Sequence, residues 1–109
     1  MSFNASALLL KKNDGVWCED KVEINSVNDI LKIFIPYENN VAQVNINKYL
    51  KVYYCVQFIT DGIEARVTDM DCTTHYMSSP LLLVECDDDK PIKLSDEALK
   101  KLKDTIDFY

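Results

Sequence analysis

The dipeptide Asp61-Gly62, between two runs of strand-forming residues, constrains this chain more than any other feature. Asp-Gly in this setting favours a type I′ hairpin turn, because that turn needs a positive φ at both central residues. We therefore predict that Tyr49–Thr60 and Ile63–Asp71 pair as a central antiparallel hairpin. Counting outward from the turn gives the expected facing pairs: Phe58 with Ala65, and Val56 with Val67.

The two predicted strands have one apolar face and one mixed face. Successive residues of a strand point to opposite faces, so the register separates two sets of side chains. The apolar set is Leu50, Val52, Tyr54, Val56, Phe58, Ile63, Ala65 and Val67, and the mixed set is Lys51, Tyr53, Cys55, Gln57, Ile59, Glu64, Arg66 and Thr68. This division is typical of an antiparallel sheet that is covered on one side.

Alternation and turn residues predict further strands. These are Phe3–Lys12 and Val16–Ile24, joined at Asn13-Asp14-Gly15, then Val41–Asn47 and Leu81–Val84. A two-residue turn after Val41–Asn47 would mix the faces of the hairpin, so we expect a longer turn or a bulge there. The uniformly apolar Leu81–Val84 indicates a central strand covered on both faces.

A short helix is predicted between the first hairpin and Pro36. Asn25 or Ser26 can cap it, and its apolar residues have helical spacing. Those residues are Val27, Ile30, Leu31 and Phe34. Two β-branched residues, Ile33 and Ile35, leave a buried strand open as the alternative.

The C-terminal helix is predicted from Ser95 to about Asp107. Ser95 is a favourable N-cap, and acidic residues follow it in the first turn. Its apolar stripe is Ala98, Leu99, Leu102 and Ile106. We expect Leu99, Leu102 and Ile106 to pack on the central hairpin near Val52, Val56 and Phe58.

The length of 109 residues suits a single domain, 1–109, of the α+β class. We expect a mostly antiparallel sheet of about six strands with one or two helices packed on one face. No apolar run approaches the ~20 residues of a membrane span, and the N-terminus lacks the basic start of a signal peptide. These features predict a cytoplasmic protein that does not contact membranes.

The cysteines lack metal-ligand spacing, which favours free thiols at Cys18, Cys55, Cys72 and Cys86. Two disulfide bonds among them are the alternative.

The charge balance favours a basic protein partner. Eighteen acidic residues against twelve basic ones give a net charge of −6, and Arg66 is the single arginine. Arginine is the preferred residue for bidentate contacts with phosphates and bases, so direct nucleic-acid binding is disfavoured. An acidic surface steers association with positively charged surfaces, whereas the simpler interpretation is that this charge keeps the domain soluble.

No catalytic arrangement can be justified from the sequence. His75 is the single histidine, and Cys72, Asp69 and Asp71 precede it closely. Their spacing fits neither a nucleophile–base pair nor a calcium-binding loop, and the two glycines of the chain cannot form a phosphate-binding loop. We therefore expect a protein that is not an enzyme, with no catalytic residue, cofactor or metal.

The acidic run that follows Leu81–Val84 is the sharpest polar feature. It is interpreted either as a solvated turn, as a docking surface for a cationic partner, or as a divalent-cation site. The predicted docking residues are Asp69, Asp71, Tyr76, Glu85, Asp87, Asp88, Asp89 and Tyr53. A small acidic α+β domain without catalytic residues is typical of immunity proteins, antitoxins and inhibitors of host enzymes. We therefore predict an inhibitor or immunity-type protein that occludes a nuclease toxin or a nucleic-acid-processing enzyme.

The alternative function is that of a structural subunit which self-associates through sheet edges. An open sheet has edges that can pair with another chain. Trp17, Tyr53 and Ile59 add apolar side chains to the mixed faces. Trp17 is expected mainly to cover a sheet edge or to pack under a loop, with an exposed interaction anchor as its alternative role.

Overall fold

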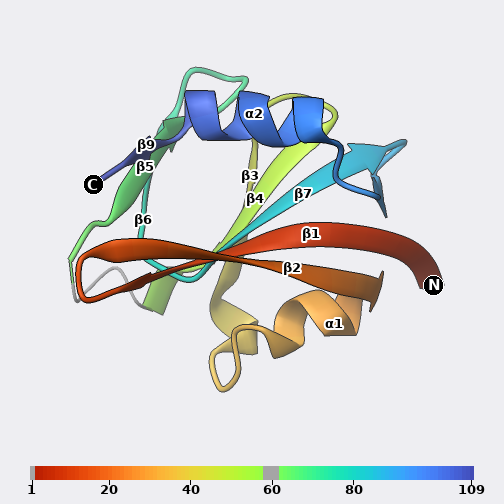
Figure 1. Ribbon diagram of the computed structural model, residues 1–109, viewed down its shortest axis with the longest axis horizontal. Coiled ribbons are helices and arrows are strands. Elements are labelled where there is room, and N and C mark those ends of the chain that lie inside the picture. The colour runs from red at the N-terminus through yellow and green to blue at the C-terminus, as the bar shows by residue number, and fades with distance from the viewer. Residues whose placement is uncertain (1, 58–61) are drawn as a thin grey trace.

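The computed structural model describes residues 2–57 and 62–109, which form two antiparallel sheets and two α-helices (Figure 1). Sheet A has the strand order β2-β1-β7-β4-β3, with β8 paired to β7, and sheet B has the order β6-β5-β9. The strands are β1 (Ser2–Asn13), β2 (Val16–Ser26), β3 (Val41–Asn45), β4 (Leu50–Cys55), β5 (Ala65–Thr68), β6 (Thr74–Met77), β7 (Leu81–Asp87), β8 (Lys90–Ile92) and β9 (Asp107–Phe108). The helices are α1 (Val27–Lys32), the 3-10 turn η1 (Glu38–Asn40) and α2 (Asp96–Thr105). The predicted α+β class with a mostly antiparallel sheet is confirmed.

Strand β7 is the centre of sheet A. It pairs with β1 on one side and with β4 on the other. Leu81 and Leu83 belong to one core, whereas Leu82 and Val84 belong to a second core on the opposite face. The prediction of a central strand covered on both faces is confirmed, because a strand with two apolar environments needs apolar residues at successive positions.

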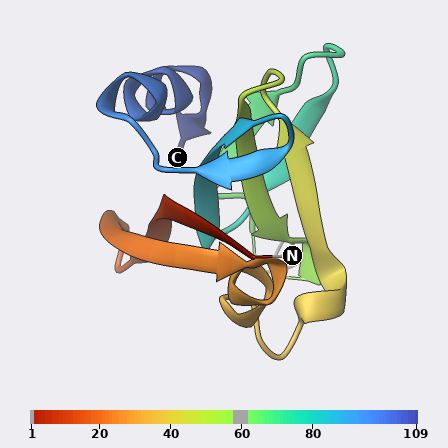
Figure 2. The same cartoon turned by 90° about the vertical axis from the view of Figure 1, so that its right-hand side faces the viewer.

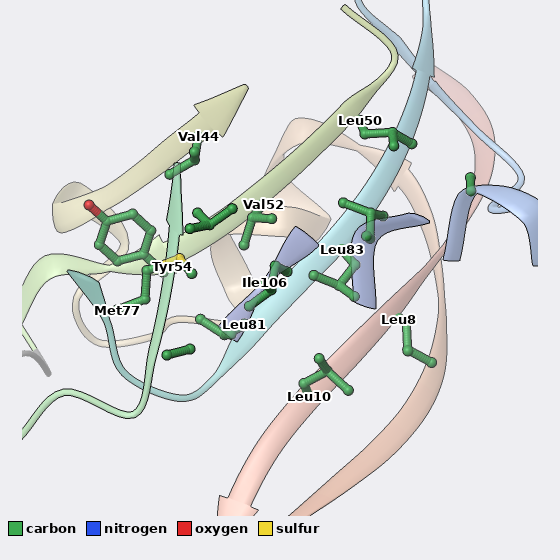
Figure 3. Packing of buried hydrophobic residues seen from close by; sticks show 14 residues of the cluster. Leu8, Leu10, Val44, Leu50, Val52, Tyr54, Met77, Leu81, Leu83 and Ile106 are labelled. Atoms are coloured by element: carbon green, nitrogen blue, oxygen red, sulfur yellow. The ribbon is translucent and has the colours of Figure 1, made fainter. Parts of the chain in front are cut away.

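The two helices cover opposite faces of sheet A, as Figure 2 shows, whereas we expected one covered face. The larger core lies between sheet A, α2 and sheet B, and Figure 3 shows its packing. Its buried residues are Leu8, Leu10, Val44, Leu50, Val52, Tyr54, Ala65, Val67, Met77, Leu81, Leu83, Ala98, Leu102 and Ile106. The second core lies under α1 and contains Ala5, Ala7, Leu9, Ile24, Ile30, Phe34, Cys55, Leu82, Val84 and Cys86.

The first hairpin forms as predicted. Asn13 faces Val16 across the turn, and Asp14 and Gly15 have φ values of 50° and 80°. Positive φ at both central residues is the signature of a type I′ turn, which matches the twist of the flanking strands. The predicted longer turn after β3 is also present, because Asn45 faces Lys51 and the four residues 46–49 connect β3 to β4.

Side-chain caps fix the start of both helices. Ser26 Oγ accepts a hydrogen bond from the Asp29 N–H, and the Asp29 carboxylate accepts one from the Asn25 N–H at 2.8 Å. Ser95 Oγ accepts from the Ala98 N–H at 3.1 Å in the same way. The two bonds to serine satisfy N–H groups in the first turn of each helix, which have no partner inside the helix. The segment that could have been a helix or a buried strand is therefore helical at Val27–Lys32.

The predicted pairing of the central hairpin is wrong. Ala65 faces Met77 and Phe108, and Val67 faces His75, so neither lies opposite residues 56 or 58. The reason is that β3 and β7 already occupy both edges of β4, which leaves β5 no edge to pair with. The predicted turn residue Asp61 and its neighbours 58–60 lie outside the described residues.

The predicted apolar face of that hairpin is nevertheless correct for much of its length. Leu50, Val52 and Tyr54 of β4 share the larger core with Ala65 and Val67 of β5. The two strands meet through their side chains across the core and not through backbone hydrogen bonds. The face predicted to be mixed is covered only along β4, where the Lys51 and Cys55 side chains are buried and the Tyr53 side chain is half-buried. Its other described members include three exposed residues, Gln57, Arg66 and Thr68.

Helix α2 docks as predicted, with Leu102 and Ile106 in the same core as Val52. Of the other expected contacts, Val56 is exposed and Phe58 lies outside the described residues. The chain then forms β9, which the sequence did not indicate. Phe108 of β9 packs edge-to-face on Trp17, with 5.2 Å between ring centroids.

The end of the chain ties the first hairpin to sheet B. The Trp17 Nε1–H and the Lys12 ammonium both donate to the carbonyl oxygen of Tyr109, at 3.2 and 2.9 Å. Trp17 therefore packs under the final segment, in agreement with its expected role. Within the described residues, neither α1 nor α2 provides an apolar stretch of the length that a bilayer crossing requires.

Candidate acidic interface

The acidic run forms the tight turn between β7 and β8. Asp87 faces Lys90 across this turn, and Asp88 and Asp89 have φ values of 50° and 63°. Aspartate tolerates this left-handed backbone better than most residues do. The side chains of residues 87–89 are all exposed, so the turn presents three carboxylates to solvent.

One of these carboxylates also has an internal partner. Asp89 Oδ1 lies 3.3 Å from the Lys51 ammonium, whose side chain is only 10% exposed. A buried ammonium without a counter-charge is unfavourable, so Asp89 stabilises the position of Lys51. Asp87 and Asp88 have no such contact among the bonds and ion pairs of the described chain.

Glu85 contributes to the fold as well as to the charge. Its Oε1 accepts a hydrogen bond from the Ser95 N–H at 2.8 Å, at the residue that caps α2. This bond ties the start of α2 to strand β7. Glu85 is half-buried, in contrast to the three aspartates of the neighbouring turn.

Asp69 organises the loop between β5 and β6. Its Oδ1 accepts from the Asp71 N–H at 2.9 Å and from the Thr73 N–H at 3.0 Å. Its Oδ2 lies 2.7 Å from His75 Nε2, which donates because a carboxylate can only accept. The bond from His75, followed by those from the backbone, holds the pKa of Asp69 below its ordinary value. The Asp71 side chain is exposed on the same loop.

The β3–β4 loop connects the two acidic segments. The Met70 N–H donates to the Asn45 carbonyl oxygen at 3.1 Å, and the Cys86 N–H donates to the Tyr49 carbonyl oxygen at 2.6 Å. The β5–β6 loop and the β7–β8 turn therefore each lie beside the β3–β4 connection, on either side of it in Figure 1, and all three are in the upper half of both ribbon views (Figures 1 and 2). We name this region the acidic end: Asp69, Asp71, Asp87, Asp88 and Asp89, with Lys48 and Tyr49 between them.

The two predicted tyrosines do not belong to the acidic end. Tyr53 is half-buried on the face covered by α1, and this burial, with the nearby Cys86 and Asp89, raises its pKa to about 12. Tyr76 is exposed on sheet B, opposite Arg66, which pairs with Asp107 at 3.0 Å. Six of the eight predicted residues thus lie at or beside the acidic end. Tyr53 is near only its Asp89, from the face covered by α1, and Tyr76 lies on sheet B.

Tyr49 is an exposed aromatic residue at the acidic end that the sequence did not single out for binding. Its side chain is 48% exposed, and the Lys48 ammonium lies 4.9 Å from its ring centroid. Its place at the start of the predicted strand Tyr49–Thr60, beside the expected longer turn, is the sequence signal that could have identified it. Its position at the acidic end, however, depends on the hydrogen bond to Cys86, which is distant in the sequence.

In residues 2–57 and 62–109 no group of three or more histidine, cysteine, aspartate and glutamate side chains is arranged to hold a metal ion. The four cysteines are free thiols, exposed at Cys18 and Cys72 and buried at Cys55 and Cys86. Comparison of the chain with protein-family models, curated proteins and solved structures found no match.

Proposed function

We propose that this chain is a non-enzymatic, cytoplasmic binding protein that occludes a basic partner, in the manner of an inhibitor or immunity protein. The partner would be a nuclease toxin or another enzyme that processes nucleic acid. The observation that supports this is that two acidic segments, far apart in the sequence, both border the β3–β4 connection and so lie at one end of the protein. Enzymes that bind phosphate backbones have positively charged clefts, and a surface of carboxylates is complementary to them.

The acidic end has the electrostatic properties that such binding needs. Opposite potentials on two proteins raise the association rate by steering their encounter. The net charge of −6 repels other anions. The single arginine, Arg66, lies on sheet B and is paired with Asp107. Direct contact with nucleic acid is therefore disfavoured.

The acidic end is also held in place by the protein itself. Hydrogen bonds from Met70 and Cys86 fix the neighbouring connections, and Asp69 closes its own loop with two backbone bonds. Binding by a preorganised surface loses less conformational entropy than binding by a mobile one. The described loops of the acidic end therefore fit a rigid docking surface.

The test removes two carboxylates and leaves the fold intact. Asp87→Asn/Asp88→Asn keeps the turn, because asparagine also adopts positive φ, and it leaves Asp89 paired with Lys51. The matched control, Asp20→Asn/Glu23→Gln, removes the same charge from exposed positions of β2. A partner captured from the source cell is identified, and its association with each variant is measured by stopped-flow at several salt concentrations.

We expect the Asp87/Asp88 variant to associate at least ten times more slowly and with weaker salt dependence, and the β2 control to change the rate little. Equal effects of the two variants would contradict the assignment of the acidic end. A captured partner that is itself acidic would overturn the function.

Self-association as a structural subunit is the second candidate, and the open edge of β2 favours it. This edge strand is 11 residues long, and none of the strands that the structure describes pairs with its outer side. Its exposed charges, Glu19, Asp20, Lys21 and Glu23, are a common protection against edge pairing, which is why we place this candidate second. Sedimentation at micromolar concentration distinguishes them: a stable oligomer favours assembly, and a monomer favours the inhibitor.

A further inference from the structure

The backbone of Tyr49 is held by hydrogen bonds, whereas its side chain projects into solvent. The Asn47 Oδ1 accepts from the Tyr49 N–H at 2.7 Å, and the Tyr49 carbonyl oxygen accepts from the Cys86 N–H at 2.6 Å. The backbone is therefore anchored both within its loop and to β7. About half of the side chain is nevertheless exposed. An aromatic ring on a fixed backbone contacts a partner at a low cost in conformational entropy.

Tyr49 lines two surface hollows, each of about 260 Å³. The first is formed with Lys48 and the three aspartates of the β7–β8 turn. The second lies toward the start of α2, and its charged lining residues are Glu85, Glu97 and Lys101. Tyr49 thus lies between two hollows that are both lined by acidic residues. Either hollow is large enough for a long side chain.

A positively charged group of the same chain already lies close to the Tyr49 ring. The Lys48 ammonium is 4.9 Å from the ring centroid of Tyr49, within the range of a cation–π contact. Both side chains are exposed, so this contact is weak and solvent competes with it. The position therefore attracts a cation, and the ligand now in place is a flexible side chain of the same loop.

We propose that the ring of Tyr49 is the seat for a guanidinium or ammonium group of the basic partner, and that Lys48 occupies this seat in the unbound protein. The proposal rests on the function proposed above and names the contact that its partner makes. An arginine is the better occupant, because its planar group stacks on the ring while its N–H groups reach carboxylates. The carboxylates of Asp87 and Asp88 line the same hollow. On binding, Lys48 turns out into solvent.

The probe is hexaarginine, titrated into the isotope-labelled protein at low salt and followed by NMR. We expect the largest shifts at the amides of Tyr49 and of residues 87–89. Two variants then separate the seat from general charge. Lys48→Met removes the ammonium group that contacts the Tyr49 ring. Lys90→Met removes one positive charge beside the neighbouring turn and leaves the Lys48 contact in place.

Both variants should tighten peptide binding, because each makes the acidic end more negative. Lys48→Met should tighten it about two- to fivefold more than Lys90→Met, which is the factor expected for an exposed cation–π contact. Replacing the ring in both backgrounds, by Tyr49→Leu, should erase this difference. The same substitution at an exposed tyrosine of sheet B, Tyr76→Leu, should leave the difference unchanged.

Equal tightening by Lys48→Met and Lys90→Met would overturn the seat, as would a difference that survives Tyr49→Leu. Peptide shifts confined to other surfaces would overturn it too. The wider function is judged separately by the association rate of the Asp87→Asn/Asp88→Asn variant. A slower rate in that variant with no ring effect would reject the seat alone.

Discussion

Replacing Leu102 by alanine should be among the most destabilising single changes in this domain. Leu102 is 0% exposed, and it lies in a core bounded by sheet A, sheet B and α2. Removal of its three outer carbons loses about 2.4 kcal/mol of transfer free energy. Two hydrogen-bonded sheets cannot collapse fully into the space, so a residual cavity brings the expected loss to about 3–5 kcal/mol.

That loss is a large part of the roughly 5–15 kcal/mol by which a domain of this size is stable. Urea unfolding should therefore shift strongly, followed both by far-ultraviolet circular dichroism and by the fluorescence of the single tryptophan, Trp17. Leu99→Ala is the matched control, because it changes the same residue type on the same helix at a half-buried position. We expect it to lose about 1–2 kcal/mol. Equal and small losses for both variants would refute the docking of α2 on this core.

Three further results are expected. Deleting residues 108–109 should shift the Trp17 emission to longer wavelength and lower the free energy of unfolding by about 1–3 kcal/mol, because Trp17 loses its ring and carbonyl partners. The lowered pKa of Asp69 means that its bond with His75 stabilises the fold above about pH 4 and is lost as the pH falls through the folded pKa. Urea titrations should thus show Asp69→Asn less stable than the parent protein at pH 5, with a smaller difference at pH 3. The raised pKa of Tyr53, about 12, keeps its phenol neutral when the unfolded chain ionises, so the parent should lose stability relative to Tyr53→Phe between about pH 10 and 12.

Elements with strong local signals could be predicted from the sequence. The Asp14-Gly15 turn joins adjacent strands, and their pairing forms because β7 occupies only one edge of β1 and leaves the other to β2. The C-terminal helix has both a capping serine and an apolar stripe, and the apolar run of β7 identifies a strand with two covered faces. In each of these cases the residues that determine the element lie within or beside it.

Elements determined by distant contacts could not be predicted in this way. A local Asp-Gly signal cannot show that β3 and β7 already occupy both edges of β4. Strand β9 has two residues, and it exists because β5 offers an edge where α2 ends. The candidate site also combines features determined locally with features determined by distant contacts. Its acidic residues stand out in the sequence, whereas the place of Tyr49 among them depends on β7.

The charges of Asp87 and Asp88 are not explained by the fold. A turn with positive φ at two residues accepts asparagine as readily as aspartate, and three adjacent carboxylates repel one another. Asp89 has a structural reason for its charge in Lys51, whereas the described structure gives none for the other two.

Asp87→Asn/Asp88→Asn should therefore leave the free energy of unfolding within about 0.5 kcal/mol of the parent value, or raise it slightly. Thermal and urea unfolding at low salt, where repulsion is least screened, measure this directly. A loss above about 1 kcal/mol would mean that the two carboxylates serve the fold, and the docking function would then lose its main support. Unchanged stability with slower association would place their role in binding.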